Sequence, residues 1–119
     1  MGQPAGPYRV ADHFSSSEVS VDKMYRKLIA AARKLGPVAE SPKKTSIHLE
    51  RKTAFAAVYV RKSYINLVVK ADHEIKSLRV QKIEKVSRNR VFHTIKLDSV
   101  ADIDGELLGW IKDAYLLSQ

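Results

Sequence analysis

Residues 45–70, TSIHLERKTAFAAVYVRKSYINLVVK, decide the fold of this chain. Apolar and polar residues alternate in the first six and the last seven positions, as in strands with one buried face. The segment between them, TAFAAVYV, is rich in β-branched and aromatic residues, which favour strands. Polar breaks at Arg51-Lys52 and Arg61-Lys62-Ser63 separate the segments, so we predict three consecutive antiparallel strands.

Two more strands are predicted further along the chain. Residues 91–97 alternate clearly, whereas residues 80–86 have the weakest pattern of the five. The polar sequence Ser87-Arg88-Asn89-Arg90 between them is typical of a turn. Short strands with short connections favour an antiparallel meander.

Apolar residues recur at helical spacing on both sides of the strand region. The first helix is predicted to begin at Ser20 as N-cap and to stop at Gly36-Pro37, because proline cannot continue a helix. The second is predicted to follow Ser99 and Asp102, an S-x-x-D variant of the capping box. Its apolar stripe comprises Val100, Ile103, Leu107, Trp110, Ile111, Ala114 and Leu117.

Two amphipathic helices can cover one face of an antiparallel sheet. We therefore predict an α+β fold: a two-layer sandwich with an N-terminal helix, an antiparallel meander of about five strands and a C-terminal helix, both helices on one sheet face. Residues 17–119 are expected to form a single α+β domain, and residues 1–16 an extended N-terminal arm. The second sheet face should then face solvent.

Charge is concentrated in the middle of the chain. Residues 43–96 contain fourteen Lys and Arg against four Asp and Glu, and the pI of the chain is about 9.8. This balance favours a polyanionic or acidic partner. The absence of cysteine excludes disulfides and thiolate chemistry. No apolar run approaches the roughly 18 residues of a membrane span, and the N-terminus does not resemble a signal peptide, so we expect a cytoplasmic protein.

Three turns supply the candidates for contacting an anion. These candidates are Lys43, Lys44, Arg61, Lys62, Arg88 and Arg90. Solvated turn residues are the simpler interpretation of each turn taken alone. Aromatic residues beside cations are typical of single-stranded nucleic acid binding, but Phe55, Tyr59 and Tyr64 could equally pack against a helix.

A small-ligand pocket or enzyme centred on Lys44, Thr45, Lys62 and His93 is the alternative. His93 shares strand parity with apolar neighbours, where a histidine is more often a hydrogen-bonded core residue than a catalytic base. No catalytic residue, metal site or cofactor is predicted, because the histidine spacing matches no known ligand set. The acidic cluster Asp98, Asp102, Asp104 and Glu106 is explained by helix-start chemistry.

Four segments together resemble a known family. They are PKKTSIHL at 42–49, FAAVYVRKS at 55–63, SRNRVFHTIKL at 87–97 and DIDGELLGWIKDAY at 102–115. Over roughly residues 12–117 the chain resembles the domain of unknown function family 5655. The resemblance implies a small bacterial helix–strands–helix domain and assigns no activity.

The sequence thus favours a non-enzymatic binding module for nucleic acid or an acidic protein over an enzyme. A protein–protein interaction or oligomerisation module is a third hypothesis. Its sign would be exposure of Leu108, Trp110 or Leu116.

Overall fold

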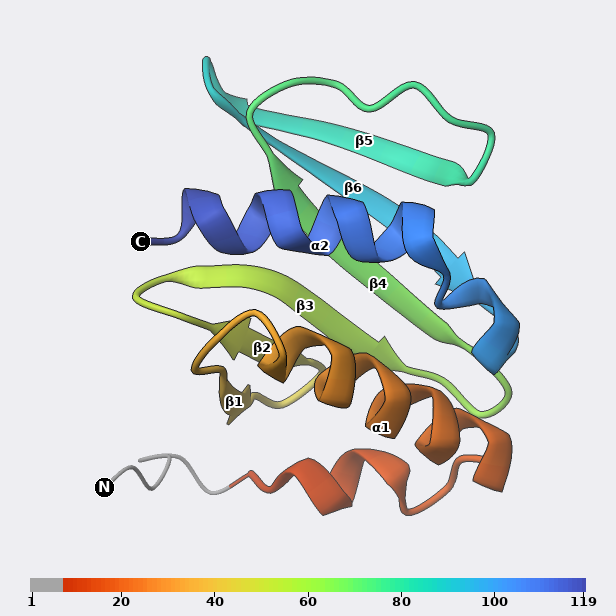
Figure 1. Ribbon diagram of the computed structural model, residues 1–119. Coiled ribbons are helices and arrows are strands. Elements are labelled where there is room, and N and C mark those ends of the chain that lie inside the picture. The colour runs from red at the N-terminus through yellow and green to blue at the C-terminus, as the bar shows by residue number, and fades with distance from the viewer. Residues whose placement is uncertain (1–7) are drawn as a thin grey trace.

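Two helices lie side by side on one face of a single antiparallel sheet in the computed structural model, which describes residues 8–119 (Figure 1). This confirms the predicted α+β fold class. The helices are α1 (Val19–Arg33) and α2 (Gly105–Leu117). The strands are β1 (Ala39–Pro42), β2 (Ile47–Glu50), β3 (Ala54–Val60), β4 (Ile65–Ala71), β5 (Val80–Ser87) and β6 (Arg90–Leu97).

The sheet has six strands in the order β1-β2-β3-β4-β6-β5, one strand more than the sequence suggested. The additional strand, β1, has the sequence AESP and ends in Pro42, so it lacks both an apolar pattern and a full set of backbone donors. It lies at a sheet edge, where a proline is tolerated. The meander order is broken once, because residues 72–79 carry the chain past the place of β6 and set β5 at the other edge.

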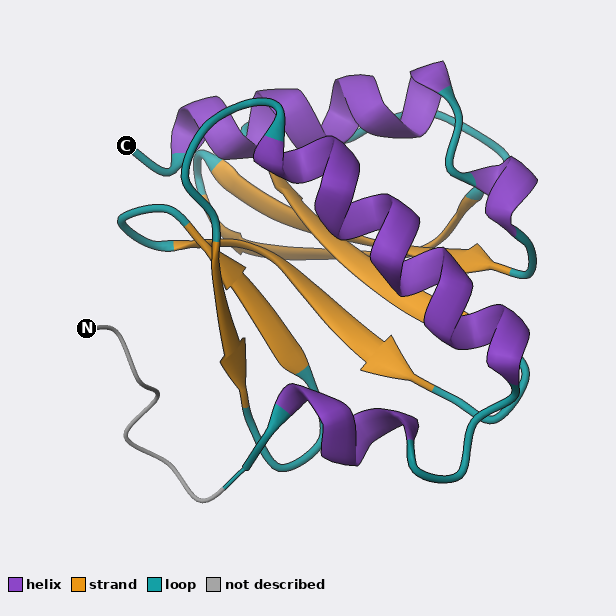
Figure 2. Ribbon diagram, turned by 60° about the horizontal axis from the view of Figure 1, so that its bottom comes forward, coloured by secondary structure: helices purple, strands orange, loops and turns teal. Residues whose placement is uncertain are grey.

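The helix-covered face of the sheet is continuous and apolar. Strand register aligns Ile47, Val58, Leu67 and Ile95 in one row across four strands, and each is fully buried. Met24 and Leu28 of α1 and Leu107 and Ile111 of α2 belong to the same core. Figure 2 shows α1 and α2 together on one side of the sheet.

One irregularity changes which way an aromatic residue points. Strict alternation along β3 would place Phe55 on the same face as Tyr59. The register of β2 and β3 shifts here, because Leu49 pairs with Ala56 and Glu50 with Ala54, which leaves Phe55 unpaired between them. Phe55 is instead fully buried, and its ring packs edge-on against Tyr115 of α2, with ring centroids 5.4 Å apart. The aromatic residues that the sequence grouped together are therefore divided between the two faces.

The helix ends agree only in part with the sequence pattern. Helix α1 begins earlier than predicted, with Glu18 rather than Ser20 at the N-cap. The predicted Ser99–Asp102 capping box is present and starts a short 3-10 helix, Val100–Asp102. Asp104 then caps α2, because its side chain accepts a hydrogen bond from the Leu107 N–H at 3.1 Å.

The predicted N-terminal arm, residues 1–16, lies partly outside the described residues. Its described part contains a 3-10 helix, Val10–Phe14, in place of extended chain. The Phe14 ring packs against Tyr25 of α1 at a centroid distance of 5.1 Å. None of the helices described in residues 8–119 has the length and apolar character needed to cross a membrane.

Replacing Gly36 with alanine is expected to destabilise the domain by about 1–3 kcal/mol. Gly36 has φ +148°, which disfavours any side chain, and an added methyl would collide with the Tyr115 hydroxyl. That hydroxyl donates to the Pro37 carbonyl at 3.0 Å, so it cannot move away without losing a hydrogen bond. Urea unfolding measures the effect.

Gly109→Ala is the matched control, because a methyl at this position in α2 meets no atom within 4 Å. We expect this change to stabilise the domain by up to about 1 kcal/mol, as alanine favours a helix interior. Equal losses of stability in the two variants would contradict the steric argument.

Candidate ligand groove on the open face of the sheet

The sheet face that the helices leave uncovered contains a hollow of about 540 Å³, which we call the open-face groove. Its floor is a row of side chains that strand register aligns across five strands. In order from β2 to β5 the row is His48, Ala57, Val68, Thr94 and Lys82. The three central side chains are short, and this is why the middle of the face is hollow.

Two rows of longer side chains border this floor. Tyr59, Asn66 and Lys96 pair across β3, β4 and β6 on one side. Lys70, Phe92 and Glu84 align across β4, β6 and β5 on the other. The rows are four residues apart along each strand, or about 13 Å at a rise of about 3.3 Å per residue. The groove is therefore wide enough for a planar ring lying on the floor.

The charges that line the groove are mainly positive and unpaired. Arg61, Lys70 and Lys82 line it together with one carboxylate, Glu84. Within residues 8–119 none of these four residues forms a salt bridge. Lys96, at the rim, differs, because its Nζ lies 4.5 Å from the centre of the Tyr64 ring and 3.6 Å from Asp98 Oδ1.

Lys70 is the most enclosed of these cations, with 8% of its surface exposed. Its Nζ donates a hydrogen bond to Thr53 Oγ1 at 3.2 Å. Burial lowers the pKa of Lys70, and the nearby charge of Arg90 lowers it further, because both disfavour the ammonium form.

The groove also offers neutral polar groups. Burial is the main cause that lowers the pKa of His48, with a smaller contribution from Lys43, so this imidazole is neutral at pH 7. Asn66 and Thr94 add an amide and a hydroxyl on the floor and rim. An amide, a hydroxyl and a neutral imidazole can each both donate and accept hydrogen bonds. The groove can therefore contact an uncharged, hydrogen-bonding ligand group as well as an anion.

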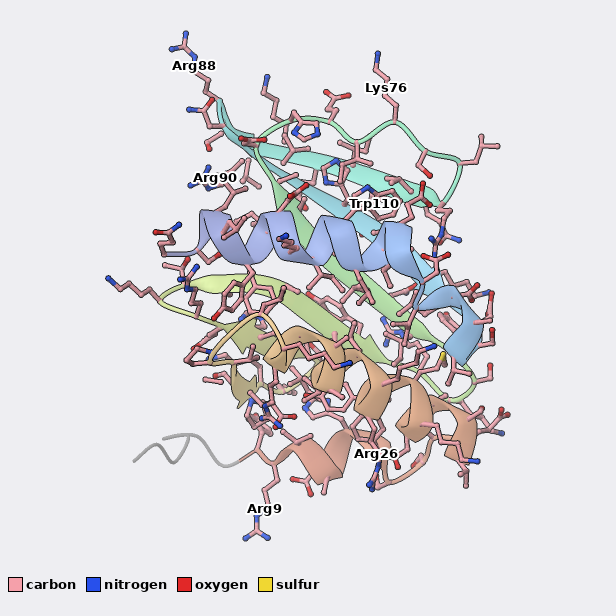
Figure 3. The ribbon with its side chains drawn as sticks, viewed as in Figure 1. Arg9, Arg26, Lys76, Arg88, Arg90 and Trp110 are labelled. Carbon is pink, nitrogen blue, oxygen red and sulfur yellow. The ribbon has the colours of Figure 1, made fainter. Side chains whose placement is uncertain are left out.

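The six residues predicted to contact an anion fall into two groups. Arg61 lines the groove, and Lys43, Lys44 and Lys62 are exposed in turns at the same end of the sheet. Arg88 and Arg90 belong to the β5–β6 turn at the opposite end. Figure 3 shows Arg88 pointing away from the body of the domain. The structure thus brings four of the six to one end and two to the other.

The alternative pocket residues do not meet in one hollow. Lys44, Thr45 and Lys62 are exposed at one end of the sheet. His93 is fully buried on the helix-covered face, four residues along β6 from Leu97 at that end. Its Nε2 accepts a hydrogen bond from the Ile75 N–H at 2.8 Å, which requires a neutral ring with the proton on Nδ1.

Nδ1 of His93 has no partner with hydrogen-bond geometry in the described part of the chain. Burial lowers the pKa of His93, and backbone groups of Val69 and Val91 oppose this only in part. His93 therefore anchors the β4–β5 connection through Ile75.

Other cations of the basic segment stabilise the helix side of the fold. Arg79 Nη1 pairs with Asp104 at 2.9 Å and with Glu106 at 3.1 Å, so it joins the β4–β5 connection to the start of α2. The Arg51 guanidinium lies 4.4 Å from the centre of the Tyr115 ring. The positive charge of residues 43–96 is consequently divided between the two sides of the sheet.

Exposure of Leu108, Trp110 or Leu116 was the expected sign of a protein–protein interaction module, and these residues differ in exposure. Leu116 is 49% exposed, whereas Leu108 and Trp110 are half-buried. The Trp110 ring lies beneath Arg79, with 5.7 Å between the guanidinium carbon and the ring centre. No group of three or more His, Asp or Glu in residues 8–119 is placed to hold a metal ion.

Sequence reasoning missed most of the groove. Asn66, Lys70, Lys82, Phe92 and Thr94 line it, and none was among the predicted site residues. The alternating pattern of the sequence could have identified these residues. The positions between the buried apolar residues of β4 and β6 are those that face the groove.

The family model described as Domain of unknown function (DUF5655) matches residues 10–118. The chain belongs to this family. The match confirms the resemblance found in the sequence and extends to both helices and all six strands. Neither the search of curated proteins nor that of solved structures found a match.

The stability of the domain is expected to fall in mild acid because of His93. Its folded pKa lies below the usual 6.5, so the unfolded chain binds the proton more readily. The contribution of neutral His93 to the free energy of unfolding is fully present above about pH 6.5. It decreases as the pH falls from there toward the folded pKa. Urea unfolding at pH 7.5 and at pH values down to about 5 measures this decrease.

His93→Gln should flatten this pH dependence, because the amide oxygen can still accept from Ile75 but does not titrate. His48→Gln is the comparison, since His48 is half-exposed and its pKa is lowered as well. An unchanged dependence in His93→Gln would rule out a role for His93.

Proposed function

We propose that this domain is a non-enzymatic binding module for single-stranded nucleic acid, which it takes up on the open face of the sheet. The observation that supports this most is the mixture of side chains there: Tyr59, Tyr64 and Phe92 are interleaved with Arg61, Lys70 and Lys82. Aromatic rings stack with bases while cations contact phosphates, and a sheet surface presents both on one side.

Single strands fit the groove better than a duplex does. The hollow is shallow, about 540 Å³, and lies across the strands between two rows of side chains. Stacking requires an unpaired base, which a duplex does not offer. The two α-helices, α1 and α2, lie on the opposite face of the sheet, so neither can enter a major groove from the open face (Figure 2).

An acidic protein is the competing partner, and it would use the cations alone. Binding of an acidic protein would not explain why three aromatic rings lie on a solvent-facing sheet surface. Nucleic acid accounts for both the rings and the charge, which is why we favour it.

Binding of a fluorescent oligothymidylate, followed by anisotropy, is expected to weaken steeply with salt. Each phosphate contact on a single strand contributes about 0.7 to the slope of log K against log salt. Arg61→Gln should weaken binding and lower the slope by about this amount. Arg88→Gln removes the same charge at a position pointing away from the domain and should change binding much less (Figure 3).

Equal effects of the two arginine variants would place the binding surface elsewhere. Competition by polyglutamate as strong as that by unlabelled oligonucleotide would favour an acidic protein partner instead. An oligonucleotide affinity that does not depend on salt would contradict binding through the cations of the groove, whether the partner is nucleic acid or an acidic protein.

Phe92→Leu is expected to reduce oligonucleotide affinity by about 1–3 kcal/mol, or about 5- to 150-fold, through loss of base stacking. Leucine keeps an apolar side chain at this half-buried position, so the fold should be retained. The salt slope should remain unchanged, because no phosphate contact is removed. A reduced slope with unchanged affinity at low salt would contradict a stacking role.

A further inference from the structure

At one end of the open-face groove lies a largely buried lysine, Lys70, which forms no salt bridge within residues 8–119. Lys70 is 8% exposed, and of its three N–H donors one is directed to Thr53 Oγ1, at 3.2 Å. The carboxylate on its own row, Glu84, lies two strands away, beyond Phe92. Neighbouring strands are about 4.8 Å apart, so these two backbones are separated by about 10 Å.

A second cation adds to the positive charge at this end. Arg90 lies on the same face of β6 as Phe92, two residues before it, and is close enough to disfavour the charged form of Lys70. The nearby carboxylate of Asp72 is directed instead to the His73 ring, with Oδ1 2.7 Å from Nδ1. Arg90 itself donates to the Asn89 carbonyl at 2.7 Å, and its charge helps to lower the pKa of Asp72. Lys70 is thus held beside a like charge, and within residues 8–119 it forms no salt bridge.

We infer that Lys70, Thr53 and Arg90 form a subsite for a phosphate group at this end of the groove. An ammonium, a hydroxyl and a guanidinium supply donors from three side chains, which suits a tetrahedral oxyanion. An anion gains more beside an enclosed cation than beside a solvated one, because less water screens the pair. The subsite rests on the proposed function for the source of the phosphate, a nucleic acid backbone.

The location of the subsite relates the charged end of the groove to its aromatic and short side chains. The subsite adjoins Phe92, which pairs with Lys70 across β4 and β6. Thr94 of the floor row is two residues beyond Phe92 on β6. A phosphate at Lys70 would leave the attached nucleoside over Phe92 and the floor. The charged end and the aromatic middle would then contact successive parts of one nucleotide.

Sulfate is a suitable probe, because it has the shape and charge of phosphate and does not titrate near neutral pH. The ε-methylene signals of the lysines, recorded by NMR on the full chain against pH at constant ionic strength, report each ammonium separately. We expect one signal to titrate at lower pH than those of the other twelve lysines and to be absent in Lys70→Arg. Sulfate should raise its midpoint in a saturable manner.

Two variants leave Lys70 in place and test its partners. Thr53→Val and Arg90→Gln should each weaken sulfate binding several-fold, while Lys62→Gln, an exposed lysine outside the groove, should not. Amide spectra verify that each variant is folded. The inference is overturned if sulfate moves the Lys70 midpoint no more than those of exposed lysines, or if Lys62→Gln weakens sulfate binding equally.

Oligonucleotide titrations separate this inference from the proposed function. If oligothymidylate binds and Thr53→Val and Arg90→Gln weaken it no more than Lys112→Gln, an exposed lysine of α2 on the helix-covered side, the subsite is wrong and the function stands. If sulfate raises the Lys70 midpoint but no oligonucleotide binds, the anion subsite stands and nucleic acid is not its ligand.

Discussion

The whole arrangement depends on one constraint: α1 and α2 cover a single face of a sheet, and successive side chains along its central strands alternate between the two faces. Once Ile47, Val58, Leu67 and Ile95 are aligned under the helices, the residues next to them in sequence must face the other way. A slip of one residue in register would exchange the two faces and expose the core. The packing that stabilises the domain therefore also fixes the composition of the groove.

The shape of the groove follows from the same constraint. Ala57, Val68 and Thr94 are the short side chains directly behind the row that α1 and α2 cover. On β4 and β6 longer side chains occur two residues before and after them, and on β3 Tyr59 follows Ala57 by two residues, so a hollow forms between the longer side chains. Such a site is built on rigid strands, and its side chains should move little when a ligand binds.

Much of the fold could be predicted from the sequence, because burial of one face leaves a clear pattern in β2, β4 and β6. Strand β1 could not, since an edge strand ending in Pro42 has little burial to pattern it. The direction of Phe55 could not either, because it depends on a register shift between two strands. For the site, Arg61 was predicted and Lys70 was missed, as a lysine next to Val69 gives no sign of its burial.

The two sides of the sheet use their cations differently, and this difference is the main argument for a ligand. On the helix side, Arg79 is paired with carboxylates, Arg51 lies over a ring, and Lys27 donates to the Val100 carbonyl at 2.9 Å. Each of these contacts contributes to the fold itself. In the groove, Lys70 is largely buried beside Arg90, and within the described residues it donates to the Thr53 hydroxyl and to no carboxylate, an arrangement that costs stability in the free domain. A largely buried lysine that forms no salt bridge within residues 8–119 supports the proposal of an external anion at this site.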